Sequence, residues 1–236
     1  MPDLAYNRNM TSKNHKRQTE RGNVLFYILI AVALLGALSF AVAQSGRGNV
    51  QQLSEERARL LGTEILEYSN LVSNALTQLT LRGCDESELN FDNPVVSGYT
   101  NAAAPSDGSC DIFGTNGGGL SWQEQDPASR DATNENFTDY QINATNNIPD
   151  LRSFSGELIF LAEVNQLVCT TMNDQLGVSP ADPPNVEAGM SLHTSFKFTG
   201  SYSQVSNINS YGRELAACFE HGPSGRHYYY KVLLAR

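Results

Sequence analysis

The sequence predicts an α+β protein in which a long N-terminal helix packs on a small antiparallel sheet. An uncharged apolar run of twenty residues, 24–43, is followed by apolar residues at helical spacing, and β-prone segments with turn signals fill the C-terminal third. The length of 236 residues allows one medium domain with an appendage, or two small domains. With 40% hydrophobic and 17% charged residues, the composition excludes a charge-rich disordered chain.

Residues 24–43 have the length and composition of a transmembrane helix. At about 1.5 Å per residue, a helix of this length spans about 30 Å, the thickness of a bilayer core. A basic leader, residues 1–22, precedes the run with a net charge of +3, and Arg47 is the first charged residue after it. The positive-inside bias therefore predicts a cytoplasmic leader, a single crossing by residues 23–44, and a C-terminal part outside the cytoplasm.

Three processing routes are compatible with this N-terminus. The segment can remain as an uncleaved signal anchor. It can be a secretory signal cleaved after Ala43, because residues 41–43 are a small-x-small site, although the apolar run exceeds the 7–15 residues usual for such signals. Cleavage between Gly22 and Asn23, where the basic leader ends, would instead leave the helix on the mature chain.

The run ERGNVLFYILIAVALLGALSFAVAQS, residues 20–45, resembles the N-terminus of type IV pilin-like proteins and type II secretion pseudopilins. The chain as a whole resembles uncharacterised pilin-like membrane proteins of Gram-negative bacteria. The shared features are the basic leader, the glycine at the junction and the uninterrupted apolar helix. The family usually has phenylalanine at the first mature position and glutamate at the fifth, where this chain has Asn23 and Tyr27.

This resemblance implies an inner-membrane protein with a periplasmic C-terminal domain. It also implies a long helix that lies half in lipid and half against a globular domain, and a role as a minor pilin-like or pseudopilin-like component of an envelope assembly. The partners would be other pilin-like subunits or envelope proteins. The alternative function is a stand-alone periplasmic binding domain on a single-pass anchor.

The apolar helix carries a candidate packing face. Ala33, Ala37 and Ala41 recur every four residues with Gly36 beside them, and small residues on one face let helices approach closely in lipid. The alternative is that alanine is simply common in such segments. Beyond residue 22 the chain has a net charge of −12, which repels phosphate backbones, so we expect no nucleic-acid partner.

Residues 45–83 are interpreted as a hinge and an amphipathic helix. The sequence QSGRGN, residues 44–49, predicts a break in the helix because it holds two glycines. An apolar stripe then runs at spacings of three and four residues, and Gly83 supplies a stop. The residues of the stripe are Leu61, Ile65, Tyr68, Val72, Ala75 and Leu79.

Residues 84–150 are rich in Asn, Asp, Gly, Ser and Pro and predict a loop-rich irregular region with a few short strands. Residues 151–236 predict a β-rich region with a short helix. It contains a strand within residues 154–164, a helix over 165–176 ended by Gly177, and a strand over 190–199. A terminal hairpin turns at residues 222–225.

The cysteines Cys84, Cys110, Cys169 and Cys218 all lie on the predicted outer side of the membrane. An oxidising compartment makes two disulfides the natural interpretation. Of the three possible pairings we favour Cys84 with Cys110 and Cys169 with Cys218. A zinc site is disfavoured because no Cys-x-x-Cys or paired-histidine spacing is present.

The remaining polar motifs give weak signals. Asp126, Asp131, Glu135 and Asp139 form an acidic loop of the kind that binds calcium in the major pseudopilins, but its spacing matches no EF-hand. We therefore expect no cofactor, with calcium as the one candidate, and favour a solvated loop.

Two further motifs lie in the terminal hairpin. His221 and His227 flank its turn, where two histidines can face each other and bind a metal, although such a pair is more often inert. Tyrosines 228–230 either pack inward or form an exposed aromatic edge. We find no nucleophile elbow, zinc-binding helix motif or phosphate loop, and predict no enzymatic activity.

Overall fold

The computed structural model describes residues 21–131, 139–148, 151, 156–179, 183–186, 196–203, 206–208 and 214–235. The chain divides into two units, Met1–Gln51 and Gln52–Arg236, which are described separately. The helices are α1 (Arg21–Leu81), α2 (Gln166–Leu176) and two single 3₁₀ turns, η1 (Glu86–Glu88) and η2 (Pro127–Ser129). The strands are β1 (Gln141–Asn147), β2 (Glu157–Val164), β3 (Asn185–Val186), β4 (Ser206–Asn207), β5 (Ala216–His221) and β6 (Arg226–Leu234).

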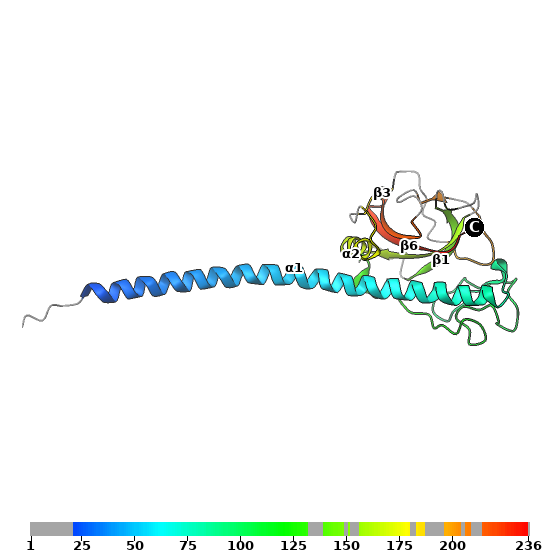
Figure 1. The fold of residues 1–236 in the computed structure, drawn as a ribbon, viewed down its shortest axis with the longest axis horizontal. Coiled ribbons are helices and arrows are strands. Elements are labelled where there is room, and N and C mark those ends of the chain that lie inside the picture. The colour runs from blue at the N-terminus through cyan, green and yellow to red at the C-terminus, as the bar shows by residue number, and fades with distance from the viewer. Residues whose placement is uncertain are drawn as a thin grey trace, which may run out of the picture. The chain divides into compact units, whose positions relative to one another are not determined.

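The second unit is an α+β fold built on one sheet. Four antiparallel strands stand in the order β5-β6-β2-β1, and the two-residue strands β3 and β4 add a parallel pairing at each edge. Figure 1 shows the sheet and α2 on one side of the C-terminal part of α1, with loops of residues 84–131 running along and beneath that part of the helix. The predicted small antiparallel sheet is therefore confirmed.

The amphipathic stripe of α1 is the centre of the core. All six predicted residues, from Leu61 to Leu79, are buried. The Tyr68 ring lies 5.2 Å from the Tyr140 ring and 5.9 Å from that of Phe160, and the Ser69 hydroxyl lies 3.1 Å from the Tyr229 hydroxyl. These contacts fix the helix against the face of the sheet that carries the even-numbered residues of β2.

Helical backbone continues through residues 44–49, where the sequence predicted a break. A glycine costs only about 1 kcal/mol relative to alanine in a helix, so two glycines do not by themselves end one. The boundary between the two units nevertheless falls close by, after Gln51. The side chains of α1 are described for residues 24–40 and from residue 54 onward.

The predicted short helix is confirmed as α2, and both of its ends have a clear chemical cause. The side chain of Asn165 accepts a hydrogen bond from the Val168 backbone N–H at 3.0 Å, which caps the N-terminus. Gly177 adopts φ +70° at the C-terminus, a conformation that favours glycine. On the face toward α1, a Cβ placed on Gly62 would lie 2.8 Å from the side chain of Met172, so the glycine permits close approach of the two helices.

The hairpin β5–β6 is also confirmed, and β1 lies within residues 84–150, where a few short strands were expected. Its sequence, QINATNN, is mostly amide side chains, and nothing in their strand propensity predicts a strand. It forms because β2 offers a pairing edge and because Ile142 and Ala144 point into the core. The predicted strand at 190–199 lies largely outside the described residues, and residues 196–199 are not in a strand.

Residues 84–131 carry no strand pairing except an isolated bridge between Asn90 and Asp111, so β1 is the strand described within residues 84–150. Their apolar residues nevertheless reach the main core, where Leu89, Phe91 and Ile112 are fully buried. Gly117 and Gly118 lie in a turn. A Cβ on Gly117 would lie 2.2 Å from the Asp111 carbonyl oxygen, so this approach requires glycine.

Both favoured disulfides are present. Cys84 is bonded to Cys110, with 5.8 Å between the Cα atoms, and Cys169 to Cys218, with 5.4 Å. The first closes a loop across the irregular region, and the second joins α2 to strand β5. No cysteine is free.

We predict that Ile65→Ala lowers the free energy of unfolding of the second unit by about 2–5 kcal/mol, because Ile65 is 1% exposed and its truncation leaves a cavity under the sheet. Leu60→Ala, on the same helix but 67% exposed, is the matched control and is expected to change it by less than about 0.5 kcal/mol. Guanidinium chloride titration of the full chain in detergent measures both values. Equal effects of the two substitutions would contradict the assigned packing face.

Candidate functional site

The first candidate surface is the apolar segment of α1 in the first unit. All seventeen described side chains from residue 24 to residue 40 are exposed, with Leu34 and Phe40 each 65% exposed. Water does not solvate so large a continuous apolar surface favourably, so the segment needs apolar surroundings. Within the part of the chain that the structure describes, no helix combines the length and hydropathy needed to cross a membrane.

The predicted packing face lies on this segment. Ala33, Gly36 and Ala37 are exposed, and no atom lies within 4 Å of a Cβ built on Gly36. The side chain of Ala41 lies outside the described residues. Packing of a second helix on this face remains a prediction.

The predicted processing residues lie at the start of the same helix. Gly22 and Asn23 have helical backbone within the first turn of α1, and their side chains are outside the described set. The leader up to residue 20 is likewise outside it. Cleavage after Gly22 therefore stays a prediction.

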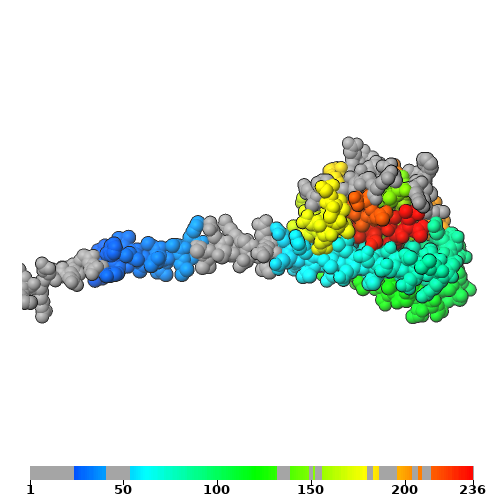
Figure 2. All heavy atoms as spheres, in the orientation of Figure 1, coloured from blue at the N-terminus to red at the C-terminus, as the bar shows by residue number. Residues whose placement is uncertain are grey.

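The second candidate is a polar cavity of about 430 Å³ in the loops of residues 84–131. Figure 2 shows these residues, in green, gathered along α1 at the end of the second unit. The cavity is lined mainly by amide, carboxylate and hydroxyl side chains. They include Asn90, Asn101, Asp107, Asp111, Thr115 and Asn116.

The buried amides at this cavity are held by local hydrogen bonds. Asn90 Nδ2 donates to Asp111 Oδ1 at 2.8 Å, and Asn90 Oδ1 accepts from the Asn101 backbone N–H at 3.1 Å. Asn101 Nδ2 donates to the carbonyl oxygens of Ser87 and Leu89 at 2.7 and 2.9 Å. These amides replace the backbone pairing that a strand would supply, so they position the loop rather than point freely at a ligand.

A smaller cavity of about 230 Å³ adjoins the first and shares Pro105 and Asn116 with it. Cys84 and Cys110 line it, between the side chains of Arg82 and Glu88. Arg82 Nη1 donates to the Gly117 carbonyl oxygen at 3.0 Å, which holds the guanidinium group at the wall. Sequence analysis paired these cysteines but gave no sign that their disulfide borders a cavity.

Two members of the acidic loop have structural roles. Asp126 caps η2 by accepting from the Ala128 N–H at 2.8 Å. Asp139 accepts from Trp122 Nε1 at 3.0 Å and from the Gln125 backbone N–H at 3.3 Å, and its burial raises the pKa of its carboxyl group. Among the described residues no three acidic, histidine or cysteine side chains come together as a metal site. Glu135 lies outside those residues, so calcium binding by this loop stays a prediction.

The two turn histidines do not face each other. His221 pairs with Arg226 and His227 with Glu220 in the hairpin register, which directs the two imidazole rings to opposite faces of the sheet. The His221 ring contacts that of Tyr228 at 6.2 Å. A metal site shared by these two histidines is therefore excluded by the alternation of side chains along the hairpin.

Tyrosines 228–230 pack inward, so the alternative interpretation, an exposed aromatic edge, is wrong. All three are at most 4% exposed. Tyr230 donates its hydroxyl hydrogen to the Glu214 carbonyl oxygen at 3.0 Å. Burial raises the pKa of Tyr228 to about 12.

Sequence reasoning missed a buried polar group at the start of β2. Glu157 is fully buried, and one carboxyl oxygen accepts from the Ile148 backbone N–H at 2.7 Å while the other has no hydrogen-bond partner. Desolvation raises the pKa of this carboxyl group. A glutamate at the end of an apolar strand normally marks solvent exposure, so no pattern in the sequence reveals this burial.

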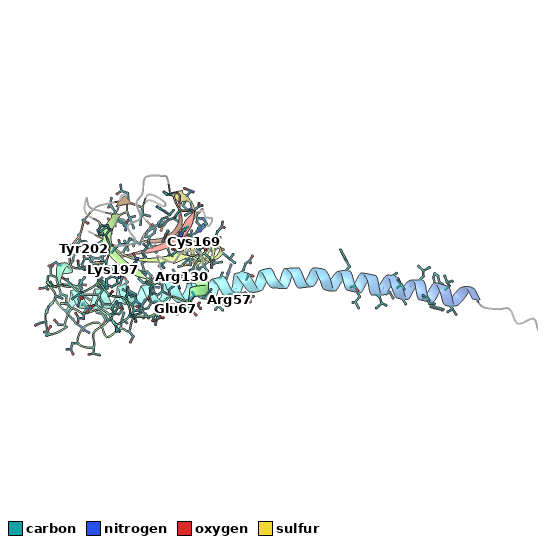
Figure 3. All side chains as sticks on the ribbon, turned by 180° about the vertical axis from the view of Figure 1, so that it is seen from behind. Arg57, Glu67, Arg130, Cys169, Lys197 and Tyr202 are labelled. Atoms are coloured by element: carbon teal, nitrogen blue, oxygen red, sulfur yellow. A yellow bond between two sulfur atoms is a disulfide. The ribbon has the colours of Figure 1, made fainter. Side chains whose placement is uncertain are left out.

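Lys197 packs over the Tyr99 ring, with 5.2 Å between the Lys197 Nζ atom and the ring centroid. Burial lowers the pKa of the Lys197 amine. Figure 3 labels Lys197 and Tyr202 toward one end of the second unit, and Cys169 near α2 toward the other.

Comparison of the chain with protein-family models, with characterised proteins and with solved structures found no match.

We predict that Glu157→Gln stabilises the second unit at pH 7 and that the difference from the unchanged protein shrinks as the pH is lowered. A carboxyl group whose pKa is raised by folding contributes its full stability below the unfolded-state pKa and loses it as the pH rises through the folded-state pKa. The glutamine keeps an acceptor for the Ile148 N–H and does not ionise.

Denaturant titrations between pH 4 and pH 8 measure this difference. The exposed Glu64→Gln is the control, and its difference from the unchanged protein should stay near zero across the range. A Glu157→Gln difference that does not vary with pH would contradict the prediction.

Proposed function

We propose that this chain is a membrane-anchored, pilin-like structural component of a bacterial envelope assembly, acting by helix packing and surface recognition. One observation carries the proposal. An uncharged apolar helix segment, solvent-exposed wherever its side chains are described, precedes in the same chain an amphipathic segment whose apolar stripe forms the core of an α+β unit.

The membrane anchor in this proposal rests on the sequence of residues 24–43. Twenty uncharged residues in helical form reach across about 30 Å, and the exposed side chains of residues 24–40 are apolar with the exceptions of Tyr27 and Ser39. Lipid tails or neighbouring apolar helices would remove this surface from water. The basic leader then orients the anchor with its N-terminus in the cytoplasm.

The two disulfides support a periplasmic location for the second unit. Disulfides persist in oxidising compartments and are rare in the cytosol. All four cysteines follow the apolar segment, on the side that the charge bias places outside the cytoplasm.

The resemblance of residues 20–45 to pilin-like N-termini points to assembly as the role of the anchor. Asn23 and Tyr27 stand where the family usually has phenylalanine and glutamate. Without that glutamate, the charge pairing thought to set the register between subunits is missing, so we propose a minor component rather than the main subunit of a filament.

The first experiment locates the protein in cells. We expect the chain to stay with the inner membrane after an alkaline wash, and the second unit to become accessible to protease only when the outer membrane is opened. A soluble chain beginning at Gln44 would contradict the anchor and favour a secretory signal.

The second experiment separates assembly from a stand-alone anchor by the intact mass of the membrane-extracted protein. Assembly predicts a mature chain that begins at Asn23, and Gly22→Ala is expected to restore the mass of the uncleaved chain because the junction needs the smallest residue. Gly36→Ala, where the added methyl meets no atom within 4 Å, is the matched control and should leave processing unchanged. An uncleaved leader in the unchanged protein would favour the stand-alone binding domain.

A further inference from the structure

The two disulfides have opposite surroundings. Cys169 of α2 and Cys218 of β5 are both fully buried. Beside them Asn173 closes the strand edge, because its amide donates to the Cys218 carbonyl oxygen at 2.9 Å and accepts from the Cys218 N–H at 2.8 Å. A reagent reaches this disulfide only after α2 has moved away from the sheet.

The Cys84–Cys110 disulfide instead borders the cavity of about 230 Å³ described above. Cys84 is half-buried, whereas Cys110 is 3% exposed, so Cys84 is the more accessible residue of the pair. The Arg82 guanidinium group is held at the wall of the same cavity. A positive charge beside a disulfide attracts thiolates, which are the nucleophiles in exchange reactions, although the Glu88 carboxylate in the same lining offsets part of this attraction.

We propose that Cys84–Cys110 is a site of thiol–disulfide exchange in the folded protein, and that Cys169–Cys218 is closed to it. The co-reactant is a dithiol. Its thiolate attacks Cys84 Sγ and forms a mixed disulfide, while the bond to Cys110 breaks and the Cys110 sulfur leaves with the electron pair and takes up a proton. The second thiolate of the reagent then attacks the mixed disulfide and releases Cys84, so the reagent is oxidised by two electrons and the protein disulfide is reduced.

Reduction of this disulfide acts on the polar cavity rather than on the core. Leu89, Phe91 and Tyr99 are fully buried within the closed loop and hold its first half after the bond opens. The second half, which leads through Pro105 to Cys110, lines both cavities and loses its covalent bond to Cys84, while the Asn90 backbone N–H still donates to the Cys110 carbonyl oxygen at 3.1 Å. The redox state of Cys84–Cys110 therefore sets the shape of the polar cavity while the fold persists.

The test uses the full chain in detergent at neutral pH without denaturant, with a series of dithiothreitol concentrations. Free thiols are trapped with an alkylating reagent at successive times, and peptide masses report which cysteines carry it. We expect Cys84 and Cys110 to be labelled at least about tenfold faster than Cys169 and Cys218, with the circular dichroism of the folded protein retained. Equal rates for the two pairs, earlier labelling of Cys169 and Cys218, or labelling only at the rate of global unfolding would overturn the proposal.

A second arm replaces dithiothreitol with a dithiol protein of the thioredoxin type at the same thiol concentration. Selective reduction of Cys84–Cys110 by either reagent supports the proposal, and the faster reagent identifies whether a small thiol or a protein is the better co-reactant. Failure of both reagents overturns it.

The double variant Cys84→Ser with Cys110→Ser tests the protection of the other pair in isolation. Its Cys169–Cys218 bond is expected to resist the dithiothreitol concentration that reduces Cys84–Cys110 in the unchanged protein. Rapid reduction of the remaining bond would contradict the closed surroundings assigned to it.

Discussion

Burial of one face of α1 against the sheet is the interaction on which the rest of the second unit depends. Between Ala58 and Leu79 the helix supplies eight buried apolar side chains. Full burial of a large apolar side chain stabilises the fold by about 1.5–3 kcal/mol relative to leaving it exposed. The helix α2 contacts β5 and β6, whereas α1 reaches Phe160 of β2 through Tyr68 and Tyr229 of β6 through Ser69. The phenolic oxygen of Tyr68 also accepts from the Gln123 N–H at 3.1 Å, so the same face holds the irregular loops.

The same helix explains why the loops of residues 84–131 keep one conformation despite their polar composition. Their few apolar residues enter the core that α1 has already formed, and side-chain amides satisfy the backbone groups that regular strands would pair. Cys84 follows the end of α1 directly, and its bond to Cys110 fastens the far side of the loop to the helix terminus. The loop is thus fixed by the helix at one end and by the core in its middle. Only its cavity-lining tip depends on the disulfide.

The parts that could be predicted from the sequence are those in which one local pattern determines the structure. The α1 stripe has the period of a helix, α2 has an asparagine cap and a glycine stop, and the hairpin has a glycine-rich turn between β-prone runs. Disulfide pairing followed from proximity along the chain and the expected elements. By contrast, β1 forms from asparagine-rich sequence because tertiary pairing overrides its weak propensity. The burial of Glu157 likewise depends on tertiary pairing. The directions of the histidine and tyrosine side chains in the hairpin depend on a strand register that the sequence does not specify.

We propose that helix α1 has two environments. Its C-terminal part lies in the core of the second unit, and its N-terminal part lies in apolar surroundings. Hydrogen exchange of the full chain in lipid nanodiscs, resolved by peptide mass, tests it most directly. We expect amides around Ile65 and Val72 to exchange only through global unfolding of the second unit. We expect the bilayer to protect the amides of residues 24–40, so that their protection survives denaturant concentrations that unfold the second unit. Rapid exchange in residues 24–40 within nanodiscs, or loss of both protections at one denaturant concentration, would contradict it.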